Sequence, residues 1–304
     1  MAAAIKILAA DSVSLSGSGI LPARKFKIIP HTGLTNEQIL LNYPDTDALL
    51  IRSTRKIDKN FIDNCNLKLI ATFTKGTDHI DMQAANKKGI VIINAEEGNH
   101  ISAAEHTLAL LLAIYKNILL SDKLVRKNKF SDTGFSRNEL FEKTIGIIGF
   151  GKVGSYVGKI CRAFGMNVIF NDINEIVVRK NKSFKFVPIN NLLDTSDIVS
   201  LHIPYCIEND KFFSRNFFRR MKRDSVFINT SRGAVVDEEA LIKFLETESL
   251  RYAGLDVFMS EPLIDKRFAG LKNVVLTNHI AGKTNESLQR ISEIMFKKIF
   301  NYFC

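Results

Sequence analysis

The chain has 304 residues, of which 46% are hydrophobic, so it can bury a sizeable core, and its length favours two domains over one. Its most apolar segment, Leu108 to Leu120, is too short to span a bilayer and contains Lys116, so we expect no membrane partner. The net charge is +10, yet the basic residues are spread along the chain with a single dense cluster, Arg219 to Arg223. Because no recognition motif or interleaved aromatic residues accompany this charge, we expect no nucleic-acid binding.

Cysteine usage and the first residues both indicate the cytoplasm. Four cysteines lie far apart, with no C-x-x-C pair and no histidine at metal-ligand spacing, so we expect neither a disulfide framework nor a metal site. The opening stretch MAAAIKILAADS has the pattern of a short strand and lacks the basic and apolar regions of a signal peptide. The sequence therefore predicts a cytoplasmic protein.

Apolar runs alternate with helical patterns through the first hundred residues. Strands are expected over 5–10, 26–30, 48–53, 67–74 and 90–95, and helices lie between most of them, for example over 36–43 and 58–65. These strands are continuously apolar, which is typical of a parallel sheet covered by helices on both faces.

A long buried helix is expected from about Ile101 to Leu120, and a polar, irregular stretch follows it over 127–140. A second alternation has expected strands over 144–150, 167–172, 197–203, 225–231, 252–257 and 273–279, and a last helix is expected over 285–303. The sequence therefore predicts an α/β protein with two Rossmann- or flavodoxin-like parallel-sheet domains and a cleft between them, where ligands usually bind.

The stretch TIGIIGFGKVG places Gly149, Gly151 and Gly154 at G-x-G-x-x-G spacing between an expected strand and an expected helix. In a dinucleotide-binding turn these glycines permit the tight turn, the approach of backbone to a pyrophosphate, and close packing of helix on strand. Asp172 ends the next expected strand, where an acid accepts hydrogen bonds from the adenosine ribose and repels a 2′-phosphate. The pattern predicts NAD, and the alternative is an aspartate that only caps an ordinary strand.

Three later residues could carry hydride-transfer chemistry, which needs a base for the hydroxyl proton, a cation for the substrate's carboxylate and a group that tunes the base. Arg232 lies in INTSRGAVVD, Glu261 in LDVFMSEP and His279 in VLTNHIAG, each at or just past the end of an expected strand. Each alone has a structural alternative: a clamp on carbonyls, a surface acid and a helix cap, respectively. All three together, after a dinucleotide turn, favour catalysis.

Five motifs, in this order, resemble the D-isomer-specific 2-hydroxyacid dehydrogenases: GFGKVG with Asp172, LHIP, NTSRGAVVDEEAL, AGLDVFMSEP and NHIAG. The resemblance runs nearly end to end and implies an NAD-dependent oxidoreductase. By this resemblance, Arg232 would bind the substrate's carboxylate and carbonyl, and His279 would be the acid/base. Glu261 would hydrogen-bond His279 and favour its protonated form.

The resemblance also implies the ligand contacts. The cofactor would meet Gly149, Gly151, Lys152, Val153, Gly154, Asp172, Ile203, Pro204, Thr230, Ser231, Asp256 and Gly282. The substrate would meet Arg52, Ser53, Lys75 and Gly76, together with Arg232 and His279.

The family's domain arrangement is discontinuous. By resemblance, residues 1–98 and 283–304 would form the substrate-binding domain, and residues 99–282 would form the NAD-binding domain. The helix that begins near Ile101 would join two copies of the chain into a homodimer.

The substrate stays open among several 2-hydroxy acids. The stretches 49–57 and 98–113 most resemble family members that oxidise D-3-phosphoglycerate to 3-phosphooxypyruvate in serine synthesis, and Arg52, Arg55 and Lys75 would supply cations for its phosphate. The stretch 72–81 is more similar to dehydrogenases of 4-phosphoerythronate. Reduction of glyoxylate or hydroxypyruvate needs no phosphate site. Outside the enzymes, an NAD-dependent corepressor-like binding module is the alternative.

Overall fold

The computed structural model describes residues 4–74, 76–95, 97–130 and 136–304. The chain divides into two compact units, one formed by Met1–Asn99 with Lys283–Cys304 and the other by His100–Gly282. Each unit is built around its own sheet, and every strand pairing in both sheets is parallel. The prediction of two parallel-sheet α/β domains is therefore confirmed.

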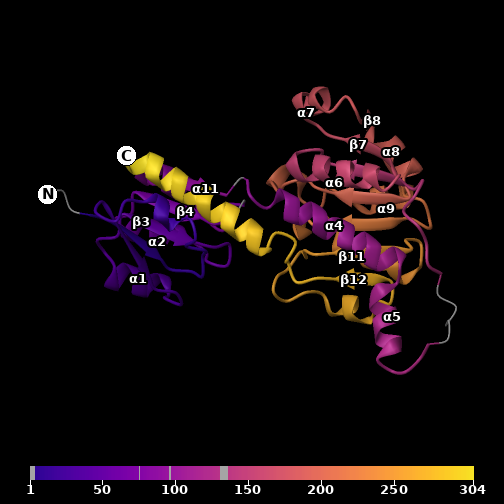
Figure 1. Cartoon of the computed structure of the whole chain (residues 1–304), viewed down its shortest axis with the longest axis horizontal. Coiled ribbons are helices and arrows are strands. Elements are labelled where there is room, and N and C mark those ends of the chain that lie inside the picture. The colour runs from indigo at the N-terminus through magenta and orange to yellow at the C-terminus, as the bar shows by residue number, and fades with distance from the viewer. Residues whose placement is uncertain (1–3, 75, 96, 131–135) are drawn as a thin grey trace. The chain divides into compact units, whose positions relative to one another are not determined.

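The first unit contains a five-stranded sheet in the order β2-β1-β3-β4-β5. Its strands are β1 (Ile5–Ala9), β2 (Phe26–Pro30), β3 (Ala48–Ile51), β4 (Leu69–Thr72) and β5 (Val91–Asn94), and its helices are α1 (Asn36–Asn42), α2 (Lys59–Asn64), α3 (Met82–Lys88) and α11 (Asn285–Phe303). Figure 1 shows α11, in yellow, lying along the strands of the indigo N-terminal region. All five strands expected in the first hundred residues are present.

Both faces of this first sheet are covered by helices. Leu50 belongs to a buried cluster that includes Met295 and Phe296 of α11, whereas its neighbour Leu49 belongs to a cluster that includes Phe61 of α2. Successive strand residues point to opposite faces, so continuous apolar strands supply a core on each side.

The second unit contains a seven-stranded sheet in the order β12-β11-β10-β9-β6-β7-β8. Its strands are β6 (Thr144–Ile148), β7 (Asn167–Asn171), β8 (Lys185–Phe186), β9 (Ile198–Leu201), β10 (Val226–Asn229), β11 (Tyr252–Leu255) and β12 (Val274–Leu276). Its helices are α4 (His100–Tyr115), α5 (Ile118–Val125), α6 (Lys152–Ala163), α7 (Glu175–Lys180), α8 (Ile189–Thr195), α9 (Arg215–Arg220) and α10 (Glu238–Glu246). The six strands expected here are present, and the two-residue β8 was too short to give a signal.

The single buried helix expected from Ile101 to Leu120 is instead two helices. Between α4 and α5, Asn117 has a φ of 52°, in the left-handed region that asparagine tolerates better than most residues. No residue of α5 is buried, and Ile118 and Leu119 are about half exposed. Apolar residues continue on both sides of this break, which is why the sequence did not reveal it.

Each sheet has a topological switch point, where ligands bind outside the carboxyl ends of the strands. In the second sheet β6 lies between β7 and β9, and in the first sheet β1 lies between β2 and β3. Within the described ranges, none of the helices is both long and apolar enough to cross a bilayer.

The contribution of α11 to the first unit can be measured. Phe296→Ala removes a fully buried ring and is expected to lower the free energy of unfolding by about 3–5 kcal/mol in urea titrations. Leu288→Ala, on the same helix but 37% exposed, is the control and should cost clearly less. Equal losses would contradict the assignment of α11 to this core.

Candidate active site

The carboxyl ends of six strands in the second sheet carry most of the residues expected to act on cofactor or substrate. On one side of the sheet, β12 is followed by His279 and Gly282, β11 by Asp256 and Glu261, and β10 by Thr230, Ser231 and Arg232. Next in sheet order, β9 is followed by Ile203 and Pro204, β6 by the glycine turn with Lys152 and Val153, and β7 by Asp172. Because all these strands are parallel, their carboxyl ends lie along one edge of the sheet.

The glycine turn has the geometry of a pyrophosphate cradle. Gly149 has a φ of 85°, and a Cβ there would lie 2.8 Å from the carbonyl oxygen of His202. A Cβ on Gly154 would lie 2.1 Å from the carbonyl oxygen of Gly149, so the first turn of α6 packs against the end of β6. Gly151 faces open space, with no atom within 4 Å of its Cβ position. The residues present therefore fit a dinucleotide phosphate at the N-terminus of α6.

Asp172, which follows β7, also holds the glycine turn in place. Its Oδ2 accepts a hydrogen bond from the Phe150 amide at 2.6 Å, and its Oδ1 accepts one from the Asn174 amide at 2.8 Å. Each carboxylate oxygen has a further lone pair, so these bonds are compatible with ribose hydroxyls as additional donors. The next residue, Ile173, is 98% exposed and brings no cation that would attract a 2′-phosphate.

His279 and Glu261 are hydrogen-bonded, with His279 Nδ1 at 2.7 Å from Glu261 Oε2. The other oxygen, Oε1, accepts a hydrogen bond from the Phe258 amide at 3.0 Å. Burial alone would raise the pKa of Glu261, but the hydrogen bonds from His279 and Phe258 outweigh it and lower that pKa. Since an ionised carboxylate only accepts, Nδ1 carries the proton and Nε2 is left for another partner.

The turn that carries His279 is held by the fully buried Asp256. Thr277 Oγ1 donates to Asp256 Oδ1 at 2.6 Å, and the amides of Ile280 and Ala281 donate to Oδ1 and Oδ2 at 2.9 and 2.8 Å. Burial would raise the pKa of Asp256, yet the nearby His106, whose Nε2 lies 3.5 Å from Oδ1, and the hydrogen bonds that the carboxylate receives lower that pKa. Asp256, expected as a cofactor contact, therefore already binds the residues on both sides of His279.

The segment that carries Arg232 is held by the buried amide of Asn229. Asn229 Oδ1 accepts from the Ser231 amide at 3.0 Å and from the Ser231 hydroxyl at 2.8 Å, while Nδ2 donates to the Arg232 carbonyl at 2.9 Å. A Cβ on Gly233 would lie 1.9 Å from the carbonyl carbon of Phe258. The backbone beside Arg232 therefore contacts the segment that leads to Glu261.

The expected substrate residues of the first unit follow two strands. Arg52 and Ser53 follow β3 and Gly76 follows β4, whereas Lys75 lies outside the described residues. These residues belong to a different unit from His279.

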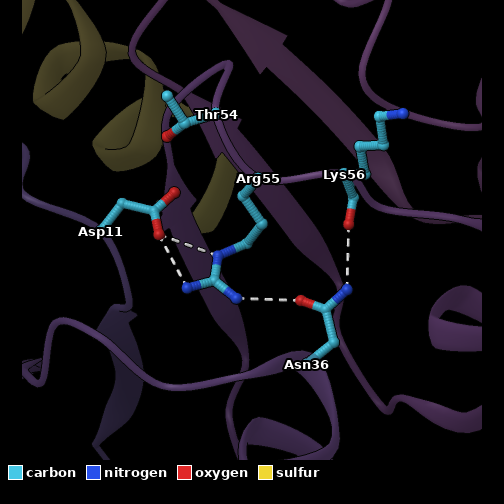
Figure 2. A pocket seen from close by; sticks show the side chains of 5 residues that line it. All are labelled: Asp11, Asn36, Thr54, Arg55 and Lys56. Carbon is cyan, nitrogen blue, oxygen red and sulfur yellow. Dashed lines mark hydrogen bonds and ion pairs between the residues drawn. The ribbon is translucent and has the colours of Figure 1, made fainter. Parts of the chain in front are cut away.

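The expectation that Arg55 offers its charge to a substrate phosphate is corrected by its contacts. Figure 2 shows the Arg55 guanidinium pointing at Asp11 and Asn36 in a pocket that Thr54 and Lys56 also line. Arg55 Nη2 lies 2.7 Å from Asp11 Oδ1, and Nη1 donates to Asn36 Oδ1 at 2.9 Å. The Arg55 side chain is only 10% exposed, so it belongs to the internal framework.

Sequence reasoning missed several residues that position the site. Asn229 had a detectable signal, because a polar side chain closes an otherwise apolar strand. His106 and Thr107 lie inside an apolar helical pattern, and nothing in the sequence pairs His106 Nε2 with Thr277 Oγ1 at 2.9 Å or Thr107 Oγ1 with Thr230 Oγ1 at 3.0 Å. In the part of the chain that the structure describes, no group of three or more His, Cys, Asp or Glu side chains could hold a metal ion.

Comparisons with known proteins identify the family of this chain. Residues 108–281 match the family model described as D-isomer specific 2-hydroxyacid dehydrogenase, NAD binding domain. The D-3-phosphoglycerate dehydrogenase of Synechocystis sp. is 35% identical over 284 residues, which are 93% of this chain and 51% of that protein. The glyoxylate reductase of Thermofilum pendens is 36% identical over 276 residues, which are 87% of this chain and 80% of that protein. The chain thus spans about half the length of the phosphoglycerate dehydrogenases that it matches.

Solved structures show the same fold. D-lactate dehydrogenase from Aquifex aeolicus, complexed with NAD and lactic acid, superposes with a TM-score of 0.84 at 28% identity, covering 98% of this chain and 95% of that one. The acyclic imino acid reductase Bsp5, in complex with NADPH and D-Arg, superposes with a TM-score of 0.87 at 31% identity, covering 98% and 97%. The match to the NAD binding domain extends over more than half of the sequence, and the chain therefore belongs to the D-isomer specific 2-hydroxyacid dehydrogenase family.

Proposed function

We propose that this protein oxidises D-3-phosphoglycerate at C2 to 3-phosphooxypyruvate with NAD. The observation that carries the proposal is the hydrogen bond between His279 and Glu261, at the same sheet edge as a dinucleotide turn that is bonded to Asp172. The choice of substrate is supported by the relatives named D-3-phosphoglycerate dehydrogenase, which match up to 98% of the chain.

Each residue of the trio has a distinct task in the proposed reaction. Bound NAD would supply the hydride acceptor. Neutral His279 would take the hydroxyl proton at Nε2, while its Nδ1–H stays bonded to Glu261. The Glu261 carboxylate would stabilise the resulting imidazolium, and Arg232 would hold the substrate's carboxylate and the developing carbonyl.

The cofactor would lie along the edge already described. The pyrophosphate would meet the backbone of Gly151, Lys152 and Val153, and Asp172 would accept from the adenosine ribose. The remaining contacts that we propose are Ile203, Pro204, Thr230, Ser231, Asp256 and Gly282. Within the first unit, Arg52, Ser53, Lys75 and Gly76 would meet the substrate.

Reduction of glyoxylate or hydroxypyruvate is the second candidate. The glyoxylate reductases of Thermofilum pendens and Thermococcus litoralis are 36% identical, and the match covers 80% and 81% of their length. The internal contacts of Arg55 also leave fewer cations for a phosphate than the sequence suggested. The remaining candidates are oxidation of 4-phosphoerythronate and an NAD-dependent binding module.

We further propose that the chain forms a homodimer through α4. The apolar side chains of Ile118 and Leu119, on the adjoining α5, are about half exposed and could be covered by a second copy. The cytoplasmic location stays a prediction.

The substrate assignment is tested by initial rates of NADH formation. Purified protein with NAD is expected to oxidise D-3-phosphoglycerate with a higher kcat/KM than 4-phospho-D-erythronate or D-glycerate. The reverse assay uses NADH with hydroxypyruvate and glyoxylate. Preference for an unphosphorylated acid would favour the second candidate, and no turnover with any acid would favour the binding module.

The roles of His279 and Glu261 are tested by a double-mutant cycle. His279→Ala should lower kcat by about 10²-fold or more, because the acid/base is lost, while NADH binding changes little. Glu261→Gln should lower kcat less, and in the His279→Ala background it should have almost no further effect, because Glu261 acts through His279. Additive losses of kcat would contradict this assignment.

The role of Asp172 is tested by fluorescence titration with NADH and NADPH. Asp172→Ala removes two charged hydrogen bonds to the turn and a ribose acceptor, so it should weaken NADH binding by about 10- to 100-fold. NADPH binding should weaken less, because the carboxylate that repels the 2′-phosphate is gone. Asp194→Ala on α8 is the control. A wild-type preference for NADPH would contradict the ribose assignment.

A further inference from the structure

We propose that Asp11 and Arg55 position the turn formed by residues 52–55 and thereby set the affinity for the substrate acid. Arg52 then supplies the positive charge that the substrate meets, while Arg55 holds the turn in place. The inference rests on the function proposed above, because it takes this turn as part of the substrate site.

Asp11 holds both ends of the turn with one carboxylate. Its Oδ2 accepts a hydrogen bond from the Arg52 amide at 2.8 Å, and its Oδ1 accepts one from Arg55 Nε at 2.9 Å. The turn itself is closed by a hydrogen bond from the Arg55 amide to the Arg52 carbonyl at 3.1 Å. The position of Arg52 therefore depends on Asp11 through a direct bond and on Arg55 through the closed turn.

All three nitrogens of the Arg55 guanidinium donate inside the unit. Besides Asp11, it donates to Asn36 Oδ1 at 2.9 Å, to the Leu34 carbonyl at 2.9 Å and to the Ala10 carbonyl at 3.2 Å. Asn36 in turn donates to the Lys56 carbonyl at 2.9 Å, as drawn in Figure 2. Arg55 thus joins the end of β1, the start of α1 and the turn after β3 (Ala48–Ile51). Four of its five N–H groups are used by these contacts, so no pair of parallel donors remains for a ligand.

Arg52 differs from Arg55 in its surroundings. Its side chain is half-buried, and no hydrogen bond or ion pair joins it to another described residue. It follows β3, whose neighbour β1 is the switch strand of the first sheet, so it lies at the edge where ligands bind. A guanidinium binds a carboxylate or a phosphate with two parallel hydrogen bonds only when it is correctly placed. The bonds of Asp11 and Arg55 that hold the turn therefore affect the affinity of Arg52 for the substrate.

The experiment measures binding of D-3-phosphoglycerate and of D-glycerate to the NADH-loaded protein by calorimetry. Asp11→Asn keeps the shape of the carboxylate but loses its charge, and Arg55→Met removes the guanidinium. Each variant should raise the Kd for D-3-phosphoglycerate by about 10-fold or more, as expected when a charge-assisted contact is misplaced. The double variant should have the same Kd as the single variant that binds the substrate less tightly, because both changes act through the same turn.

Asp47→Asn is the matched control. Asp47 also joins a backbone amide and a cation, with Lys6 N at 2.9 Å and Lys68 Nζ at 2.8 Å, but it lies at the amino end of β3. It should leave both Kd values unchanged. Asn36→Ala removes one of the bonds of Arg55, together with the bond from Asn36 to the Lys56 carbonyl, and should give a smaller increase in Kd. This variant keeps the test valid if Arg55→Met does not fold.

The outcomes separate the inference from the proposed function. If Arg55→Met weakens binding and Asp11→Asn does not, Arg55 contacts the substrate directly and the inference is wrong. Additive effects would also overturn it. If the wild-type protein binds D-glycerate better than D-3-phosphoglycerate, the proposed function fails. The inference still stands in that case if Asp11→Asn and Arg55→Met raise the Kd for D-glycerate and Asp47→Asn does not.

Discussion

The buried carboxylate of Asp256 holds the backbone on which His279 stands. The two carboxylate oxygens accept hydrogen bonds from the hydroxyl of Thr277 and from the amides of Ile280 and Ala281. The backbone carbonyl of Asp256 accepts one from the His279 amide at 2.9 Å. Without that carboxylate, the amides of Ile280 and Ala281 would lose their acceptor, at a cost of about 1–3 kcal/mol for the buried amide of Ala281. His279, at a φ of 56°, would then be held less firmly in the position from which it reaches Glu261. The hydrogen bond between His279 and Glu261 therefore depends on a residue that need not touch the reacting atoms.

The same construction recurs at other strand ends. Asp172 accepts from the glycine turn, Glu261 from the Phe258 amide, Asn229 from Ser231 and Asp11 from the Arg52 amide. In each case a polar side chain supplies the acceptor that a backbone amide loses when a strand ends. Rigid loops at the carboxyl edge result, and a rigid loop places a ligand-binding side chain more accurately than a mobile one.

Much of this organisation could be predicted from the sequence, because parallel strands leave continuous apolar runs and the glycine spacing reflects contacts such as Gly154 against the Gly149 carbonyl. The strand ends then located Arg232, Glu261 and His279. What the sequence could not give depends on contacts between distant segments. From the sequence, Arg55 is expected to be a free cation, whereas the structure bonds it to Asp11 and Asn36. Apolar residues likewise lie on both sides of the left-handed Asn117, so the sequence predicts one helix there.

We propose that residues at the carboxyl edge of the second sheet promote hydride transfer from C2 of a D-2-hydroxy acid to NAD. The most direct measurement follows deuterium from C2-labelled D-3-phosphoglycerate and D-glycerate into the cofactor by mass spectrometry. We predict reduced cofactor one mass unit heavier with a D acid, and no transfer from the corresponding L acids. Unlabelled NADH formed from a labelled acid, or equal transfer from both isomers, would contradict the claim.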